Sequence, residues 1–321
     1  MTARLPQLDG HPMVTDGGLE TDLLFHHGAD LPDFAAYPLL ASEPGRVLLR
    51  DYYLPYAAIA RDHSAGLLLE TPTWRANPDW GAVLGHTAAD LAAVNRAAVA
   101  WLQALRSTEL SDLAATAPVL VSGMIGPRGD GYRAGGAVDP AEAADYHRAQ
   151  IDVFAEAGAD LVTALTLTGA GEAAGVVRAA RAAGIPVAVS FTVETDGRLP
   201  DGSALGAALA EVDRTDPPDY YLLNCAHPTH LALAVADLTG AQRARIVGAR
   251  ANASRQSHAE LDEADVLDEG DLTDFATTSA ALAAMLPNLR VRGGCCGTDA
   301  RHVAAIWAHD RREEAAVPTP G

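Results

Sequence analysis

The clearest indication of the fold is the segment Asp160–Phe191, DLVTALTLTGAGEAAGVVRAARAAGIPVAVSF, because its pattern predicts a strand, a helix and a strand in succession. Its two short apolar runs, Asp160–Leu165 and Pro186–Phe191, predict strands. The longer stretch between them predicts a helix that ends at Gly184, a residue suited to the left-handed turn after a helix. This order is the βαβ unit of a parallel sheet.

The same alternation extends in both directions from this segment and yields eight candidate strands. They are Pro12–Thr15, Ala65–Glu70, Pro118–Met124, Asp160–Leu165, Pro186–Phe191, Tyr220–Leu223, Arg245–Ala249 and Leu289–Arg292. No obvious linker interrupts the alternation, so the sequence predicts one α/β domain over residues 1–321, a (β/α)8 TIM barrel. A doubly wound open sheet is the alternative, since order in sequence does not fix order in space.

Helix ends support these boundaries. Thr87 and Asp90 have the spacing of a capping box at the start of a helix. Asp139 precedes Pro140, which places a capping residue before a proline at the first helical position. Both patterns predict helices in the intervals between strands.

The charge and the residue content of the chain argue against several classes of function. The 321 residues carry a formal net charge of −19, which disfavours nucleic acid as a partner. We expect small molecules or further copies of the chain, as in a homo-oligomer. All basic residues other than histidine are arginine, so lysine Schiff-base chemistry is excluded. Neither a signal peptide nor a membrane span is apparent, and we expect a cytoplasmic protein that does not bind membranes.

Candidate site residues follow the predicted strands, where barrel enzymes place their chemistry. They come after strands one, two, six and eight: Asp16, Gly17, Glu70, Thr73, Trp74, Asn224, Cys225, Cys295 and Cys296. Asp16 is a candidate for binding a cationic substrate group, although Asp-Gly-Gly also suits a simple turn.

All three cysteines of the chain fall at strand ends. Three thiolates with one open position are expected of a reactive zinc site, so Cys225, Cys295 and Cys296 are candidate metal ligands. Cysteine is also commonly buried as a small apolar residue, which is the simpler interpretation. His227 is either a further ligand or a polar residue of its loop.

These motifs resemble the homocysteine S-methyltransferases. The resemblance rests on Gly293-Gly294-Cys295-Cys296-Gly297-Thr298 and Asn224-Cys225, supported by Asp16-Gly17-Gly18, Ile125-Gly126-Pro127 and Ser190-Phe191-Thr192. It runs from about residue 13 to residue 307. The resemblance implies a (β/α)8 barrel with zinc on the three cysteines, and transfer of a methyl group to a thiol activated by the metal.

One departure concerns the acceptor. Members of the family usually carry a glutamate at the end of strand four, where it binds the amino group of homocysteine. Leu165 stands at that position here, and the next acidic residue is Glu172, in the following helix. Asp16, Glu70 or a shifted group then replaces the glutamate, or the acceptor is not homocysteine.

The function expected from the resemblance is zinc-dependent methyl transfer to a small-molecule thiol acceptor from a cationic methyl donor. The donor would be S-methylmethionine or S-adenosylmethionine, and the acceptor homocysteine or a related thiol, as in methionine biosynthesis. Trp74 offers an aromatic face to the cation. The alternatives are a different thiol or selenol acceptor, and a zinc-binding barrel without catalytic activity.

Overall fold

The computed structural model describes residues 4–131, 136, 138–264 and 266–316. Within these residues, eight parallel strands close into a barrel in chain order, and the first strand pairs with both the second and the eighth. The predicted (β/α)8 barrel is therefore confirmed. The open doubly wound sheet is excluded, because an open sheet leaves its edge strands with one partner each.

The strands are short, as expected of a small closed barrel. They are β1 Met13–Thr15, β2 Gly66–Glu70, β3 Val119–Ile125, β4 Leu161–Leu167, β5 Val187–Phe191, β6 Tyr220–Asn224, β7 Ile246–Ala251 and β8 Val291–Gly294.

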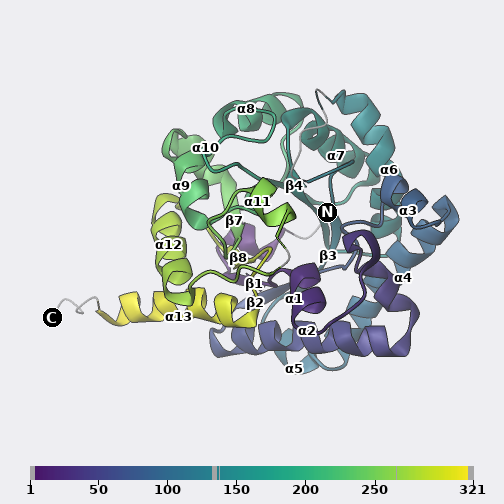
Figure 1. Cartoon of the computed structure of the whole chain (residues 1–321), viewed down its shortest axis with the longest axis horizontal. Coiled ribbons are helices and arrows are strands. Elements are labelled where there is room, and N and C mark those ends of the chain that lie inside the picture. The colour runs from purple at the N-terminus through teal and green to yellow at the C-terminus, as the bar shows by residue number, and fades with distance from the viewer. Residues whose placement is uncertain (1–3, 132–135, 137, 265, 317–321) are drawn as a thin grey trace.

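The helices surround the barrel as an outer ring (Figure 1). The α-helices are α1 Leu19–Phe25, α2 Glu43–Asp62, α3 Pro78–Val83, α4 Ala88–Ser107, α5 Ser111–Ala114, α6 Pro140–Glu156, α7 Ala170–Ala183, α8 Leu205–Thr215, α9 Pro228–Ala236, α10 Gly240–Arg245, α11 His258–Asp262, α12 Leu272–Met285 and α13 Ala300–Ala316. Short 3-10 helices occupy Pro6–Asp9, Pro32–Phe34 and Tyr37–Ala41.

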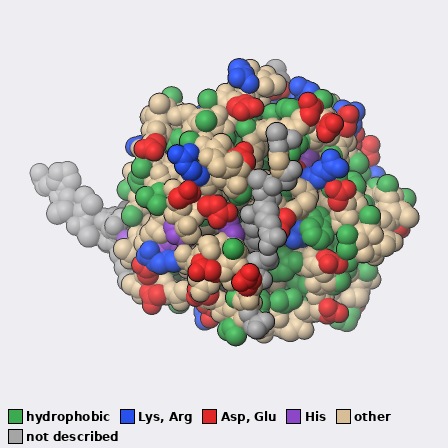
Figure 2. Space-filling model, turned by 45° about the horizontal axis from the view of Figure 1, so that its top comes forward, with side chains coloured by type: hydrophobic (Ala, Val, Ile, Leu, Met, Phe, Trp, Pro, Cys, Tyr) green, Lys and Arg blue, Asp and Glu red, His purple; other side chains and the backbone are tan. Residues whose placement is uncertain are grey.

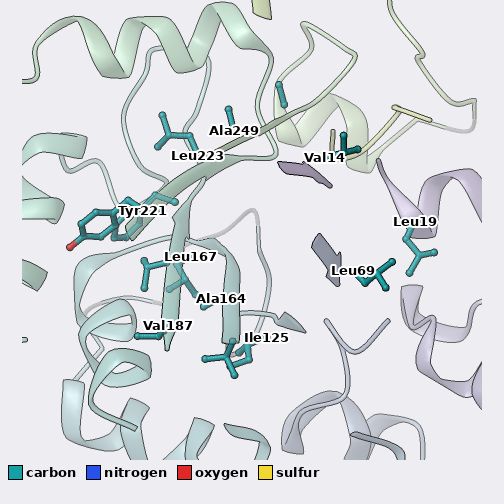
Figure 3. Close-up of a cluster of buried hydrophobic side chains, with 14 of the residues drawn as sticks. Val14, Leu19, Leu69, Ile125, Ala164, Leu167, Val187, Tyr221, Leu223 and Ala249 are labelled. Atoms are coloured by element: carbon teal, nitrogen blue, oxygen red, sulfur yellow. The ribbon is translucent and has the colours of Figure 1, made fainter. Parts of the chain in front are cut away.

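Alternate side chains of each strand enter two different cores, because successive residues of a strand point to opposite faces. Met13 and Leu68 belong to a cluster inside the barrel. Their neighbours Val14 and Leu69 belong to the larger cluster between the strands and the helices, part of which Figure 3 shows. Burial of both faces explains why these strands read as continuous apolar runs in the sequence.

The predicted helix ends are confirmed where their caps are described. Thr87 and Asp90 form both hydrogen bonds of a capping box at the start of α4. The Asp139 side chain accepts from two backbone N–H groups at the start of α6, and Pro140 is the first residue of that helix. Gly184 follows α7 in the left-handed conformation, with φ of 70°.

Strand four differs from its predicted span. It continues to Leu167, two residues beyond the predicted end, and its pairing with β5 is irregular between Ala164 and Leu167. Thr166 has a positive φ of 63° in this stretch. An irregularity of this kind redirects side chains at the end of a strand, and the sequence carries no glycine there to signal it.

Among the described residues, no helix combines the length and the apolar content that crossing a membrane requires. Acidic side chains are dispersed over the face of the molecule in Figure 2 rather than gathered in one patch.

Candidate active site

The three thiols lie together at the carboxyl ends of the strands. Cys225 directly follows β6, and Cys295 and Cys296 directly follow β8. Their Sγ atoms all lie within 4.8 Å of one another, and those of Cys225 and Cys296 are 3.7 Å apart. The structure therefore brings together the three cysteines that the sequence singles out, from two strands separated by β7.

Strand β7 holds both thiol-bearing loops. The backbone N–H of Cys225 donates to the carbonyl of Arg250 at 3.0 Å, and that of Cys295 donates to the carbonyl of Ala251 at 2.9 Å. Cys225 itself has a left-handed φ of 58°. Two backbone hydrogen bonds to adjacent residues of one strand fix the spacing of the loops, and thus of the sulfur atoms.

Asn224 connects the thiols to strands β4 and β5. Its Oδ1 accepts from the backbone N–H of Thr166 at 2.9 Å and from the Ser190 hydroxyl at 2.7 Å. Its Nδ2 donates to Thr166 Oγ1 at 2.8 Å and points to Cys295 Sγ at 3.8 Å. The side chain is fully buried, so all of its polar atoms are used within the protein. Asn224 therefore positions the strand ends around the thiols.

The thiols differ in acidity. The pKa of Cys295 lies well below that of an ordinary thiol, because Cys225 and Cys296 hydrogen-bond to its sulfur and the Arg250 charge favours the thiolate. The pKa of the Cys225 thiol is raised, because its hydrogen bonds to the sulfurs of Cys295 and Cys296, together with its burial, favour the protonated form. Negative charge on sulfur is therefore favoured at Cys295 over Cys225.

A buried ionic network lies beneath the thiols. Arg250 Nη2 donates to Asp16 Oδ1 at 2.7 Å, and Nη1 lies 4.0 Å from Glu70 Oε1. The Tyr52 hydroxyl donates to the other Asp16 oxygen at 3.0 Å. Asp16 is 2% exposed and Glu70 is fully buried. Asp16 is therefore ion-paired with Arg250, and Glu70 lies beside the same guanidinium with neither of its oxygens hydrogen-bonded among the described residues.

Burial dominates the titration of these acids. It raises the pKa of Glu70 to about 7, although the Arg250 charge opposes the shift. It also raises the pKa of Asp16, again against Arg250. Two acids around one guanidinium leave the network with at most one uncompensated negative charge.

Two other residues singled out in the sequence, Thr73 and His227, do not belong to the cysteine cluster found among the described residues. Thr73 is buried, where its hydroxyl donates to the Met124 carbonyl at 2.8 Å. His227 caps α9, its ring nitrogen accepting from the Thr229 N–H at 3.3 Å.

A pocket opens directly over the thiols. It is lined by six predicted residues, namely Gly17, Trp74, Asn224, Cys225, Cys295 and Cys296, and by Gly18, Leu19, Glu20, Thr21, Phe34, Met124, Leu165, Thr166 and Arg250. Asp16, Glu70 and Thr73 are not among its lining residues.

Two lining residues bear on specificity. Leu165 is on the pocket wall, while Glu172 lies elsewhere and bonds to His147 at 2.9 Å and to the backbone of Arg128. Glu20 is the acidic residue that sequence reasoning missed. It lies four positions after Asp16, in the first turn of α1, and only the path of the chain after β1 turns it to the pocket.

A larger cavity of about 410 Å³ adjoins this pocket and shares Thr21, Phe34, Trp74 and Cys296 with it. It lies between α1, the residues Leu261, Ala264 and Val266–Asp268, and the Trp74–Trp80 region. The Arg75 guanidinium stacks on the Trp80 ring, 3.6 Å from its centroid, and lies 4.5 Å from that of Trp74. The cavity is aromatic at one side and reaches the thiols through Cys296.

The fold and the position of the thiols put this chain in the class of (β/α)8 barrels that carry a cysteine cluster at the catalytic end. The family model of homocysteine S-methyltransferase matches residues 13–309, and the chain belongs to that family. It is accordingly a methyltransferase.

Solved structures agree on the fold. The chain is similar to the homocysteine methyltransferase MmuM from Escherichia coli in its oxidized form, with a TM-score of 0.73 at 23% identity, covering 94% of this chain and 97% of that one. For the metallated form of MmuM the TM-score is 0.73 at 22% identity, covering 95% and 98%. A comparison with curated proteins found no match.

Proposed function

We propose that this protein transfers a methyl group from a sulfonium donor, S-methylmethionine or S-adenosylmethionine, to the sulfur of homocysteine or a related small thiol, with zinc held by Cys225, Cys295 and Cys296. The observation that carries the proposal is the convergence of three thiols in the pocket at the catalytic end of the barrel.

The thiols fit a zinc ion. Sulfur atoms around tetrahedral zinc lie about 3.8 Å apart, given Zn–S bonds of about 2.3 Å. The 3.7 Å separation of the Cys225 and Cys296 sulfurs agrees with this spacing. Three soft ligands leave a fourth position for a substrate, and MmuM has been solved in a metallated form. Bound zinc would lower the pKa of the acceptor thiol, so that it reacts as thiolate.

The chain's own residues would prepare the acceptor and keep water away. Asn224 orients the Cys295 loop, and Arg250 adds positive charge beneath it. Phe34, Met124 and Leu165 supply apolar wall around the thiols. In such surroundings a thiolate is poorly solvated and is a better nucleophile toward the methyl carbon.

The donor would occupy the larger cavity. This cavity reaches the thiols at Cys296 and includes the indole of Trp74, which could lie against the sulfonium. Methyl transfer needs the donor carbon in line with the acceptor sulfur, and two cavities that meet at Cys296 and Trp74 suit that arrangement.

The apolar side chain of Leu165 favours a second class of acceptor. An apolar residue on this wall suits a thiol or selenol without a charged group at that point. Because the chain belongs to a family of methyltransferases, the alternative of a zinc-binding barrel without catalytic activity is excluded.

The test is methyl transfer by zinc-loaded protein, with each sulfonium donor offered to homocysteine and to thiols that lack its amino group. Formation of methionine supports the proposal. Turnover with the other thiols alone assigns the second acceptor class, and no transfer from either donor to any thiol refutes the proposal.

A further inference from the structure

Of the residues that the structure describes, one carboxylate lines the pocket over the thiols. Glu20 lines it, together with Gly17, Gly18, Leu19 and Thr21 from the same turn. The two other acids near the thiols do not line this pocket: Asp16 bonds to Arg250, and Glu70 is fully buried beside the same guanidinium. Among the described residues, no arginine or histidine forms an ion pair with Glu20.

Among the described residues, Arg250 is the one basic side chain on the wall of this pocket. Its Nη1 is buried and has no hydrogen-bond partner among the described residues. The pocket therefore combines three thiols, one carboxylate without an ion-pair partner among the described residues, and one buried guanidinium whose Nη1 lies 4.0 Å from Glu70 Oε1. An amino acid that carries a thiol on its side chain presents the matching groups, which are sulfur, ammonium and carboxylate.

We propose that Glu20 forms an ammonium-binding subsite, which holds the α-amino group of an amino-acid thiol while its sulfur reaches the cysteine cluster. This inference rests on the proposed function for the identity of the ligand. Glu20 then determines specificity from α1, whereas Leu165 belongs to β4. A pocket with leucine at position 165 can thereby still select homocysteine.

The test is a binding measurement by calorimetry on the zinc-loaded protein. The probes are homocysteine and 4-mercaptobutanoate, which has the same thiol, chain length and carboxylate but no amino group. The variants are Glu20→Gln, which removes the charge and keeps the shape, and Asp22→Asn as the matched control. Asp22 lies on the same helix, bonds to His26 and is absent from the pocket wall.

We expect wild-type protein to prefer homocysteine over 4-mercaptobutanoate by roughly 10- to 100-fold, the usual range for one charged hydrogen bond. Glu20→Gln is expected to abolish this preference by weakening homocysteine alone, and Asp22→Asn to retain it. Zinc content in each variant reports that the cysteine site is intact.

Equal binding of the two thiols by the wild type would overturn the inference, and so would an undiminished preference in Glu20→Gln. Two further outcomes distinguish the ammonium subsite from the methyl-transfer reaction. Glu20-dependent binding of homocysteine without methyl transfer from any donor would retain the subsite and refute the reaction. Transfer to homocysteine at equal efficiency in Glu20→Gln would retain the reaction and refute the subsite.

Discussion

Arg250 organises the floor of the pocket at the scale of single residues. It bonds to Asp16, to the carbonyls of Gly17 and Gly294, and lies beside Glu70. One guanidinium thus ties the ends of β1, β2 and β8 together from its position on β7. A buried charge group of this kind is costly to disturb, because removing one partner leaves another unpaired.

The free energy of unfolding should depend on pH through the buried carboxyl group of Glu70. Its pKa is raised from 4.5 to about 7 by burial, so the folded state binds this proton more tightly than the unfolded chain. The contribution is fully present below pH 4.5 and is lost as pH rises through about 7. Relative to Glu70→Gln, wild-type protein should lose roughly 3 kcal/mol of unfolding free energy over that range. Urea unfolding at several pH values measures this, and parallel curves would contradict it.

Asn224→Ala should destabilise the fold and lower activity together. It removes the acceptor for the Thr166 N–H and the Ser190 hydroxyl, and burial without a partner costs about 1–3 kcal/mol per group. Asn288→Ala is the control, since that exposed side chain makes one bond to the Ala244 carbonyl. Urea unfolding and methyl transfer are measured on both. Asn224→Ala protein with wild-type stability and activity would show that this amide does not position the site.

At the scale of elements, the loops after β1, β6 and β8 meet around the thiols with little space between them. A Cβ on Gly18 would lie 2.5 Å from the Cys295 carbonyl oxygen, a separation that real side chains do not adopt. The β1–α1 loop therefore packs directly on the loop that carries Cys295 and Cys296, and glycine at position 18 permits this approach.

Gly18→Ala should push the Cys295 loop away and reduce zinc affinity, with a loss of stability of about 1–3 kcal/mol. Gly240→Ala is the control, because a Cβ there meets nothing within 4 Å. The measurement is zinc retained against a competing chelator, together with the unfolding midpoint. Equal zinc retention in the two variants would contradict the tight packing of the loops.

The barrel order and the thiol cluster could be predicted from sequence because both depend on repeated local patterns. Apolar runs mark strands, and chemistry-bearing residues follow them. The commitment of Asp16 to Arg250 could not be predicted, since it joins residues 234 apart in the chain. Glu20 was missed for a related reason: it lies in a helical turn, and only the path of the chain after β1 turns it to the pocket.

At the scale of the whole molecule, the net charge of −19 is the dominant feature. Acidic side chains are dispersed over the visible face in Figure 2, so the attraction for cations is general rather than confined to one patch. Such a field raises the local concentration of a cationic methyl donor. That residues 1–321 form one domain, and that copies assemble into an oligomer, stay predictions.

Salt should therefore slow the reaction at low donor concentration. Ions screen exposed charges over about 10 Å at 0.1 M ionic strength and about 3 Å at 1 M. We expect kcat/KM for a sulfonium donor to fall several-fold between these conditions, while kcat changes little. Initial rates across donor concentrations at each ionic strength measure the effect. A kcat/KM that rises or stays constant would show that the acidic surface does not guide the donor.

Zinc bound per chain shows whether the three cysteines hold the metal that activates the acceptor. It is measured in reduced wild-type protein and in Cys225→Ser, Cys295→Ser and Cys296→Ser, with methyl transfer followed in the same samples. We expect about one zinc in the wild type and loss of zinc and activity together in each variant, because a hydroxyl is a much weaker ligand than a thiolate. Reduced wild-type protein that binds no zinc, or full activity in a zinc-free triple variant, would contradict it.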